Sequence, residues 1–306
     1  MTIAVLGGYG VGITMRVSRT PRAGETVSGG IVSREHGGKG SNQAIAMARW
    51  GARPALISAV GNDPEGHAAR ELWQREGVDD SAVPSVDDPT MSGIILVDAT
   101  GENRIAIAAG ALDSLWGAWV EPLAVRGLAG ARALVISLEV PHDAALRCSG
   151  LARQSGIPVI LNPAPAEQVP HDLWATADVL VPNQSEARAL LESGGDTLGV
   201  TLNDDVELAR QLAEHCTGVV VLTCGAEGAV VVDRSGTRRI SAPAVVAVDT
   251  TGAGDTFVGV LAAELTIGTD LDTAVDVACR AAAHSVTRHG VIDGLPFRRD
   301  IMGEDA

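Results

Sequence analysis

Basic residues are scarce in this sequence. Its 23 Lys and Arg stand against 38 Asp and Glu, so the formal net charge is −15 and the isoelectric point is near 4.8. Nucleic acids and anionic membranes bind proteins through a basic face, so this balance argues against both as partners. Small anions can still bind to backbone amides. We therefore expect small-molecule partners.

The sequence also lacks metal-like cysteine spacing, a signal peptide and long apolar runs. Its four cysteines, Cys148, Cys216, Cys224 and Cys279, form no CxxC pair, so we expect them to be structural filler in a reducing compartment. The start, "MTIAVLGGYGVG", has no basic region before a long apolar stretch, and no run of 18 apolar residues occurs. These absences predict a cytoplasmic protein.

What is present is the composition of a folded protein, with 46% hydrophobic and 20% charged residues. Short β-branched runs such as "TIAVLG" and "PALISAVG" alternate with helical patterns such as "DPEGHAARELWQREG". That helix has Asp63 as its N-cap, Pro64 at its first position and Gly77 as its stop. Strands that are apolar on both faces and separated by helices predict an α/β fold, with a mostly parallel central sheet and helices on both faces.

Two stretches interrupt this alternation. Residues 13–34 and 91–109 have strand patterns with no helix between strands, and the second predicts a hairpin that turns at "DATGEN". We expect these stretches to form a small antiparallel sheet that projects as a lid. No linker or repeat is visible, so the sequence predicts a single domain over 1–306.

One glycine-rich turn runs into an apolar helix, in "VDTTGAGDTFVGVLAAEL". Glycines at 252 and 254 leave backbone N–H groups unobstructed at the helix start, where the helix dipole adds partial positive charge. This predicts an anion cradle. Asp255 follows in the first helical turn. It is either a capping residue or, if the anion is a transferring phosphoryl group, the base for the attacking hydroxyl.

Two other glycine clusters carry weaker signals. "HGGKGSNQA" also opens a helix and contains Lys39 and Asn42, but Ser33 stands where a P-loop has its first glycine. An ordinary strand-to-helix turn would explain it equally well. "GGYGVG" does not fit the dinucleotide-binding pattern, because Ile13 occupies the place of the last glycine.

Two short motifs lie at predicted strand ends. "PNQSEA" puts Asn183 and Glu186 on one side of a first helical turn, which commonly means a capping box. "LTCGAEGAVVV" has glycines at 225 and 228, which a hairpin alone would explain.

Taken in order, several stretches resemble the ribokinase-like (PfkB) family of carbohydrate kinases, and within it the ribokinase branch. The resemblance runs nearly end to end through "AGETVSG", "GGKGSNQA", "GNDPEG", "LNPAPA", "PNQSEA", "LTCGAEG", "DTTGAGDTF" and "AAAHSVTRHG". It implies the ribokinase-like fold and an ATP-dependent kinase that phosphorylates a sugar hydroxyl.

The resemblance also implies site residues. The catalytic set would be Asp255 as base with an anion hole of Gly252, Ala253 and Gly254. Nucleotide contacts would come from Asn183, Thr223, Gly225, Gly228, Gly254 and Cys279, where ribokinases have a histidine at the last position. Mg²⁺ would be held through water by Asn183 and Glu186. The sugar would be bound by Gly38, Lys39, Asn42, Glu139 and Asp255.

A monovalent cation, K⁺, would lie beside the anion hole in family members of this kind. The matching positions are Asp249, Thr251, Ser285, Arg288, Gly290 and Gly294. The lid would exclude water from the sugar, and lids of two chains clasp each other in many relatives, which implies a homodimer.

The sequence departs from the family at two sugar-binding positions. Where ribokinases carry an asparagine and an aspartate after the first strand, this chain has Gly10 and Gly12. The loss of these two polar side chains weakens the expectation that ribose is the substrate, because sites built to hydrogen-bond a hydroxyl discriminate strongly against analogues that lack it. Arg16 and Arg19 on the expected lid strand are either solvated edge charges or ligands of a phosphorylated or acidic sugar.

The expected function is therefore ATP-dependent phosphorylation of a primary hydroxyl on a small sugar, ribose or a relative. A nucleoside kinase of the same fold is the first alternative, because Gly10 and Gly12 leave room for a bulkier acceptor. A protein that binds sugar or nucleotide without catalysis is the second.

Overall fold

The computed structural model describes residues 1–194 and 204–303. Its main sheet has nine strands, and all neighbours are parallel except at the pairs formed by the last two strands of the chain. In spatial order the strands are β15 (Gly236–Ile240), β14 (Ala229–Asp233), β13 (Val219–Thr223), β12 (Val179–Leu180), β11 (Val159–Asn162), β10 (Ala131–Ser137), β1 (Thr2–Leu6), β4 (Arg53–Ile57) and β6 (Asp79–Ala82).

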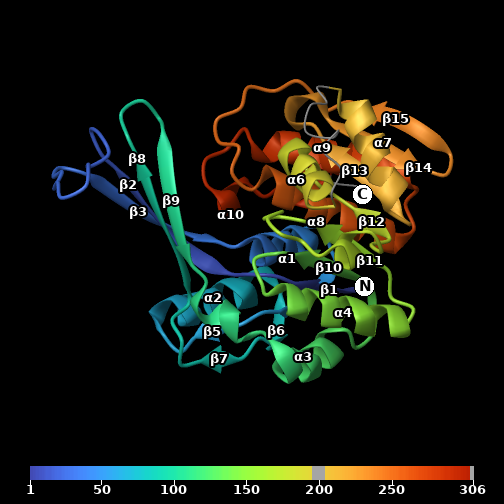
Figure 1. The fold of residues 1–306 in the computed structure, drawn as a ribbon, viewed down its shortest axis with the longest axis horizontal. Coiled ribbons are helices and arrows are strands. Elements are labelled where there is room, and N and C mark those ends of the chain that lie inside the picture. The colour runs from blue at the N-terminus through green and yellow to red at the C-terminus, as the bar shows by residue number, and fades with distance from the viewer. Residues whose placement is uncertain (195–203, 304–306) are drawn as a thin grey trace.

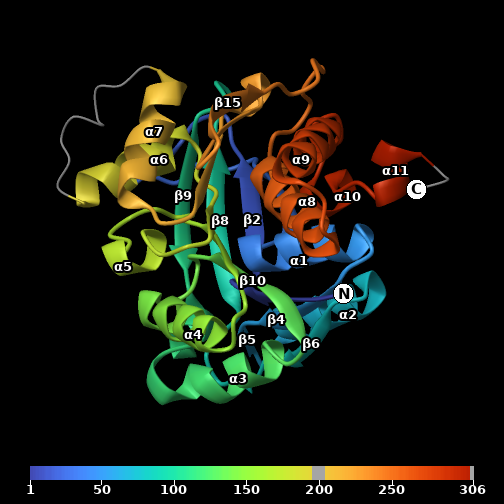
Figure 2. The ribbon, with the colours of Figure 1, turned by 90° about the vertical axis from the view of Figure 1, so that its right-hand side faces the viewer.

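Helices cover both faces of this sheet, as predicted, and Figure 2 shows the two helical layers on opposite sides. One layer contains α1 (Lys39–Arg49), α2 (Pro64–Glu76), α8 (Ala253–Ile267) and α9 (Leu271–Ser285), with the short α10 (Val291–Gly294) and α11 (Arg298–Met302). The other contains α3 (Val120–Gly127), α4 (His142–Gln154), α5 (His171–Trp174), α6 (Gln184–Ser193) and α7 (Asp205–His215). The described residues also include the short 3-10 helices η1 (Gly110–Ser114), η2 (Gly117–Trp119) and η4 (Gly225–Glu227).

The two cores follow from the side-chain alternation of the strands. In β1, Ile3 and Val5 pack toward α1 and α8, whereas Ala4 and Leu6 pack toward the opposite layer. All four are fully buried, which is why the strand is apolar on both faces.

A second sheet projects from the main body as the predicted lid (Figure 1). Its order is β3 (Ile31–Gly37), β2 (Gly10–Arg16), β8 (Met91–Val97) and β9 (Asn103–Ala108). The hairpin at "DATGEN" is confirmed, because β8 and β9 are antiparallel and Asp98 accepts the N–H of Thr100 at 2.9 Å. Outside the lid, β5 (Val60–Gly61) and β7 (Ser85–Val86) form a separate two-stranded parallel sheet.

The lid corrects the sequence-based expectation in two ways. It is mixed rather than antiparallel, because its central strands β2 and β8 pair in parallel. These two strands are separated by the long connection through α1 and α2, which lets them run in the same direction. The first expected stretch, 13–34, is also longer than predicted, because β2 begins at Gly10 and β3 ends at Gly37. Residues 17–30 between these two strands contain no strand.

The four cysteines are free, and only Cys216 is partly exposed. Across the described ranges, no helix is long and apolar enough to cross a membrane.

The start of α2 connects the main domain to the lid. Asp63 caps this helix by accepting the N–H of Gly66 at 2.7 Å, and Gly77 ends it in the left-handed conformation, both as predicted. The same carboxylate accepts the N–H of Thr90 at 2.7 Å, directly before β8 begins. One aspartate therefore fixes both a helix end and the base of a lid strand.

We expect Asp63→Ala to lower the free energy of unfolding by about 2 kcal/mol, because it removes a helix cap and leaves Thr90 without its acceptor. Asp270 is a matched control, since it caps α9 by accepting the N–H of Thr273, a residue of the same helix, whereas Asp63 also accepts the N–H of Thr90 from a distant segment. Urea unfolding should show a smaller loss for Asp270→Ala. A loss in Asp63→Ala no larger than in the control would contradict this account.

Candidate active site

The turn before α8 requires glycine at its centre. Gly252 has φ +79°, and a Cβ at this position would lie 2.8 Å from the side chain of Val291. The turn directs the first N–H groups of α8 outward, and these groups have no acceptor within a helix. The N–H of Ala253 makes a long 3.3 Å bond to the carbonyl of Thr250, whereas the space around Gly254 is open. The turn thus has the geometry that an anion cradle requires, and anion binding there stays a prediction.

Asp255 lies in the first turn of α8 and is only 6% exposed. Its Oδ2 accepts a hydrogen bond from Asn42 Nδ2 at 2.9 Å, and its Oδ1 accepts one from Gln43 Nε2 at 3.1 Å. Both donors come from α1, which packs closely on α8 because Gly259 leaves no side chain between them. The carboxylate is thus held by two amides of the neighbouring helix.

Burial raises the pKa of Asp255 above its ordinary value, although the Lys39 ammonium and the two amide donors act in the opposite direction. For Lys39, burial alone would lower the pKa, but the carboxylates of Asp255, Glu139 and Glu186 raise it. Lys39 is therefore a cation among three acidic groups. Strongly perturbed carboxylates of this kind are common at functional sites, which makes Asp255 a candidate for a chemical role.

The "GGKG" loop reaches this position through close backbone contact. A Cβ at Gly38 would lie 2.5 Å from Tyr9 Cα, and one at Gly40 would lie 2.5 Å from the backbone of Gly7. The two glycine clusters of the sequence therefore pack against each other. This gives "GGYGVG" a packing role in place of the dinucleotide role that its pattern had already excluded.

The loop places the start of α1 on a half-buried carboxylate that follows β10. Glu139 Oε2 accepts the N–H of Lys39 at 2.6 Å. Burial, together with the charge of Asp255, raises the pKa of Glu139 to about 7, even though Lys39 lowers it. Lys39, Asn42, Glu139 and Asp255 thus form one cluster, with Gly38 in the loop that supports it.

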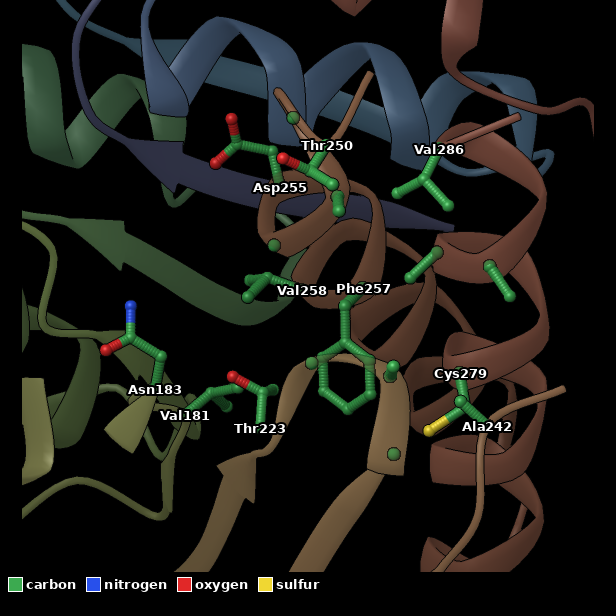
Figure 3. A pocket seen from close by; sticks show the side chains of 18 of the residues that line it. Val181, Asn183, Thr223, Ala242, Thr250, Asp255, Phe257, Val258, Cys279 and Val286 are labelled. Atoms are coloured by element: carbon green, nitrogen blue, oxygen red, sulfur yellow. The ribbon is translucent and has the colours of Figure 1, made fainter. Parts of the chain in front are cut away.

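A cavity of about 880 Å³ extends from this cluster. The start of α8 and the end of α9 line one side of it, and the segments after β12 and β13 line the other. Figure 3 shows Asp255 at one end of it and Cys279 at the other, with Asn183 and Thr223 on the opposite wall. Every residue expected to contact the nucleotide lines it, namely Asn183, Thr223, Gly225, Gly228, Gly254 and Cys279. Gly252, Ala253, Lys39 and Glu186 line it as well.

Asn183 and Glu186 form the capping box that their spacing indicates. Asn183 Oδ1 accepts the N–H of Glu186, and Glu186 Oε2 accepts the N–H of Asn183, each at 2.9 Å. Burial raises the pKa of Glu186 despite the nearby Asn183 N–H and Lys39 charge. Mg²⁺ prefers oxygen ligands and keeps several waters, so one carboxylate on the cavity wall fits an ion bound through water.

The segments expected to bind a monovalent cation lie next to each other behind the anion cradle. Asp249 accepts the N–H of Thr251 at 3.0 Å and that of Gly290 at 3.1 Å. A Cβ on Gly294 would lie 3.2 Å from the carbonyl oxygen of Ser285, which also accepts the N–H of Arg288. A carboxylate and several carbonyls are oxygen donors of the kind that hard cations prefer, so these residues fit such an ion.

The arginines of the lid are placed differently from each other. Arg16 is the last residue of β2, as expected, but Arg19 lies beyond the strand. Arg19 is exposed and donates to Glu25 at 2.6 Å. It is therefore engaged in a surface ion pair.

Sequence reasoning missed Gln43 and Asn162. Gln43 Nε2 donates to Asp255 and also to Asn162 Oδ1 at 3.1 Å, while Asn162 donates to the carbonyl of Val181 at 3.0 Å. The only signal was a glutamine next to Asn42 in the first turns of a helix and an asparagine at a strand end. Both are buried, which is unusual for these residue types.

A large α/β sheet with a cavity at the carboxyl ends of its strands, beside a glycine turn that opens a helix, is the arrangement in which α/β enzymes commonly bind ligands. The pfkB family carbohydrate kinase profile matches residues 10–298. The chain belongs to this family, and the expected enzyme class, an ATP-dependent carbohydrate kinase, is confirmed.

The individual relatives agree with this assignment. The chain is 32% identical over 311 residues to a ribokinase of Schizosaccharomyces pombe, covering 99% of this chain and 97% of the relative. Ribokinase of Thermotoga maritima has a similar structure, with TM-score 0.87, 30% identity and coverage of 98% and 97%. Arabidopsis thaliana ribokinase complexed with ribose and ATP has TM-score 0.87, 25% identity and the same coverage.

We expect the free energy of unfolding to fall as the pH rises from about 5 to about 8. The pKa of Glu139 is raised from 4.5 to about 7 on folding, so between these values the folded chain binds more protons than the unfolded chain and loses stability as they dissociate. This shift in the pKa of Glu139 corresponds to a fall of about 3 kcal/mol in the free energy of unfolding. Glu139→Gln does not titrate, so urea unfolding at both pH values should show a smaller fall. An equal fall in both proteins would contradict the assignment.

Proposed function

We propose that the protein transfers the γ-phosphoryl group of ATP to a primary hydroxyl of a small sugar, ribose or a related one. The observation that carries this proposal is the position of Asp255. It lies where the nucleotide cavity meets the Lys39, Asn42 and Glu139 cluster, so a phosphoryl donor and an alcohol acceptor would meet at its carboxylate.

In this proposal Asp255 is the catalytic base. It takes the proton of the sugar hydroxyl as the new oxygen–phosphorus bond forms, and the bond to the β-phosphate oxygen breaks with its electron pair leaving on ADP. Asn42 and Gln43 hold the carboxylate in place before the reaction, so little reorganisation accompanies the proton transfer.

The amides of Gly252, Ala253 and Gly254 form the anion hole. They would donate to the oxygens of the transferring group, and each hydrogen bond to a charged group is worth about 1.5–3 kcal/mol. The Ala253 N–H would exchange its long bond to Thr250 for one to phosphate. Lys39 would add positive charge on the acceptor side.

Asn183 and Glu186 would hold Mg²⁺ through water at the phosphate end of the cavity, while Thr223, Gly225, Gly228 and Cys279 would contact the rest of the nucleotide. When bound, Mg²⁺ would neutralise phosphate charge. Asp249 and the carbonyls of Thr251, Ser285, Arg288, Gly290 and Gly294 would hold K⁺ and so fix the shape of the anion hole.

The lid would close over the sugar and exclude water. Its exposed isoleucines, Ile94, Ile105 and Ile107, support contact with the lid of a second copy, and light scattering in solution would detect such a dimer. We place this activity in the cytoplasm, where ATP and phosphorylated sugars are found together.

Two alternatives predict different results. A nucleoside kinase would turn over a nucleoside faster than any free sugar, which the absence of polar side chains at Gly10 and Gly12 would favour. A binding protein would bind its ligands and release no ADP, although the amide-held Asp255 speaks for catalysis.

The test is ADP release from Mg-ATP with pentoses, hexoses and nucleosides, in K⁺ or Na⁺, together with identification of the phosphorylated product. We expect a sugar to be phosphorylated, with higher rates in K⁺. Asp255→Asn should lower kcat by about 10²–10⁴-fold while ATP binding is retained, because it removes the base with little change in shape. Near-normal turnover in this variant would refute the catalytic role of Asp255.

Gln43 provides an independent test of the same carboxylate. Its hydrogen bond lowers the pKa of Asp255, so Gln43→Leu should move the acid limb of the kcat profile to higher pH. A purely structural loss would lower kcat equally at every pH and leave this limb in place.

A further inference from the structure

Glycines and one glutamate share a face at the base of the lid. In the register of the lid sheet, Gly10 of β2 is opposite Met91 of β8, and Gly12 is opposite Glu35 of β3 and Gly93 of β8. Residues directly opposite each other on paired strands point to the same side, and every second residue along a strand shares that side. Gly10, Gly12, Glu35, Met91 and Gly93 therefore belong to one face.

This face is turned toward the acceptor cluster. Gly8, just before β2 begins at Gly10, borders that cluster, because a Cβ there would be 2.8 Å from Glu139 Oε2, and β3 ends at Gly37, directly before Gly38 and Lys39. The opposite face packs on the α2 side, where Val11 joins the core and His36 Nδ1 is 2.7 Å from the hydroxyl of Tyr9. Arg34 on that face pairs with Glu65 of α2 at 3.5 Å.

Position 10 is closed by its neighbour. A Cβ on Gly10 would lie 2.5 Å from Met91 Cε and 2.7 Å from the Met91 carbonyl oxygen. The side chain of Met91 therefore occupies the space in front of Gly10, and it packs with Leu112 in the buried core. No polar group can be presented from position 10 without moving a backbone carbonyl, so this part of the face is an apolar wall.

Position 12 is open. The nearest atom to a Cβ on Gly12 would be Ile95 Cδ1 at 3.4 Å, and the space at Gly93 is equally clear. Glu35 lies directly opposite Gly12 on the adjacent strand β3, and Cβ positions paired in this way lie about 5 Å apart. Over the described part of the chain, Arg34 has a carboxylate partner on the opposite face, whereas Glu35 makes no ion pair.

We propose that Glu35 is the lid residue that binds the acceptor, reaching across Gly12 from the neighbouring strand. Its carboxylate accepts hydrogen bonds from two hydroxyls of the acceptor, while Met91 contacts an apolar edge of the same molecule. The substrate class is then a neutral polyhydroxylated sugar. A phosphate or carboxylate group next to Glu35 is disfavoured, because Glu35 and Glu139 would repel it, and the cation on the same face, Arg16, lies four residues further along β2. This inference rests on the proposed kinase function.

The experiment uses the full chain and the sugar with the highest turnover in the panel. Glu35→Ala should raise KM for that sugar about 10–100-fold, as expected for loss of a hydrogen-bonded charge, with kcat and the KM for ATP within twofold. Glu102→Ala is the matched control. It removes the same charge from the turn between β8 and β9, at the far end of the lid, and should leave all three constants unchanged.

A rescue variant separates binding from general damage to the lid. Because position 12 has room for a side chain, Gly12→Asp in the Glu35→Ala background should return a carboxylate to the same space and lower KM again. If the wild type phosphorylates a sugar but Glu35→Ala keeps its KM, or if Gly12→Asp restores nothing, the inference is overturned and the kinase assignment stands. If the wild type phosphorylates no sugar, both are overturned.

Discussion

The contact between α1 and α8 is the constraint on which the site depends. Asp255 lies in the first turn of α8, and the two side-chain amides that hold its oxygens, those of Asn42 and Gln43, belong to consecutive residues of α1. The helices approach closely because Gly259 has no side chain, and a Cβ there would lie 2.6 Å from Ala46 Cβ. A buried carboxylate needs hydrogen-bond partners in fixed positions, and helix packing supplies them here.

The same principle of close backbone contact organises the acceptor side. Gly7 and Gly8 allow the "GGKG" loop to lie against β1, which sets Lys39 on Glu139 and directs α1 toward Asp255. Acidic groups are thereby gathered around a single lysine, and burial raises the pKa values of Asp255 and Glu139. Packing thus produces both the geometry and the electrostatics that the proposed proton transfer needs.

Much of the fold could be predicted from local signals. Asp63, Pro64 and Gly77 mark α2 unambiguously because caps and stops depend on neighbouring residues, and apolar strands imply two helical layers because each face must be covered. The parallel pairing of β2 with β8 could not be predicted, since it depends on the path of the chain through the main domain. The nucleotide residues were predicted only through family resemblance.

Gln43 and Glu35 show which part of the site could not be predicted from the sequence. A glutamine near the start of a helix and a glutamate on an exposed strand carry no pattern that distinguishes them from ordinary residues. Their importance arises from what lies opposite, Asp255 in one case and the bare Gly12 in the other. The empty position at Gly12 was visible in the sequence, but the neighbour able to compensate for it was defined only by the strand register.

The most direct test of the account is the structure of a complex with the preferred sugar and a non-hydrolysable ATP analogue with Mg²⁺. The account predicts that an Asp255 carboxylate oxygen lies about 2.6–3.2 Å from the primary hydroxyl of the sugar, with the γ-phosphate at the amides of residues 252–254. A hydroxyl that instead bonds to Glu139 or to another group, with Asp255 out of reach, would contradict it.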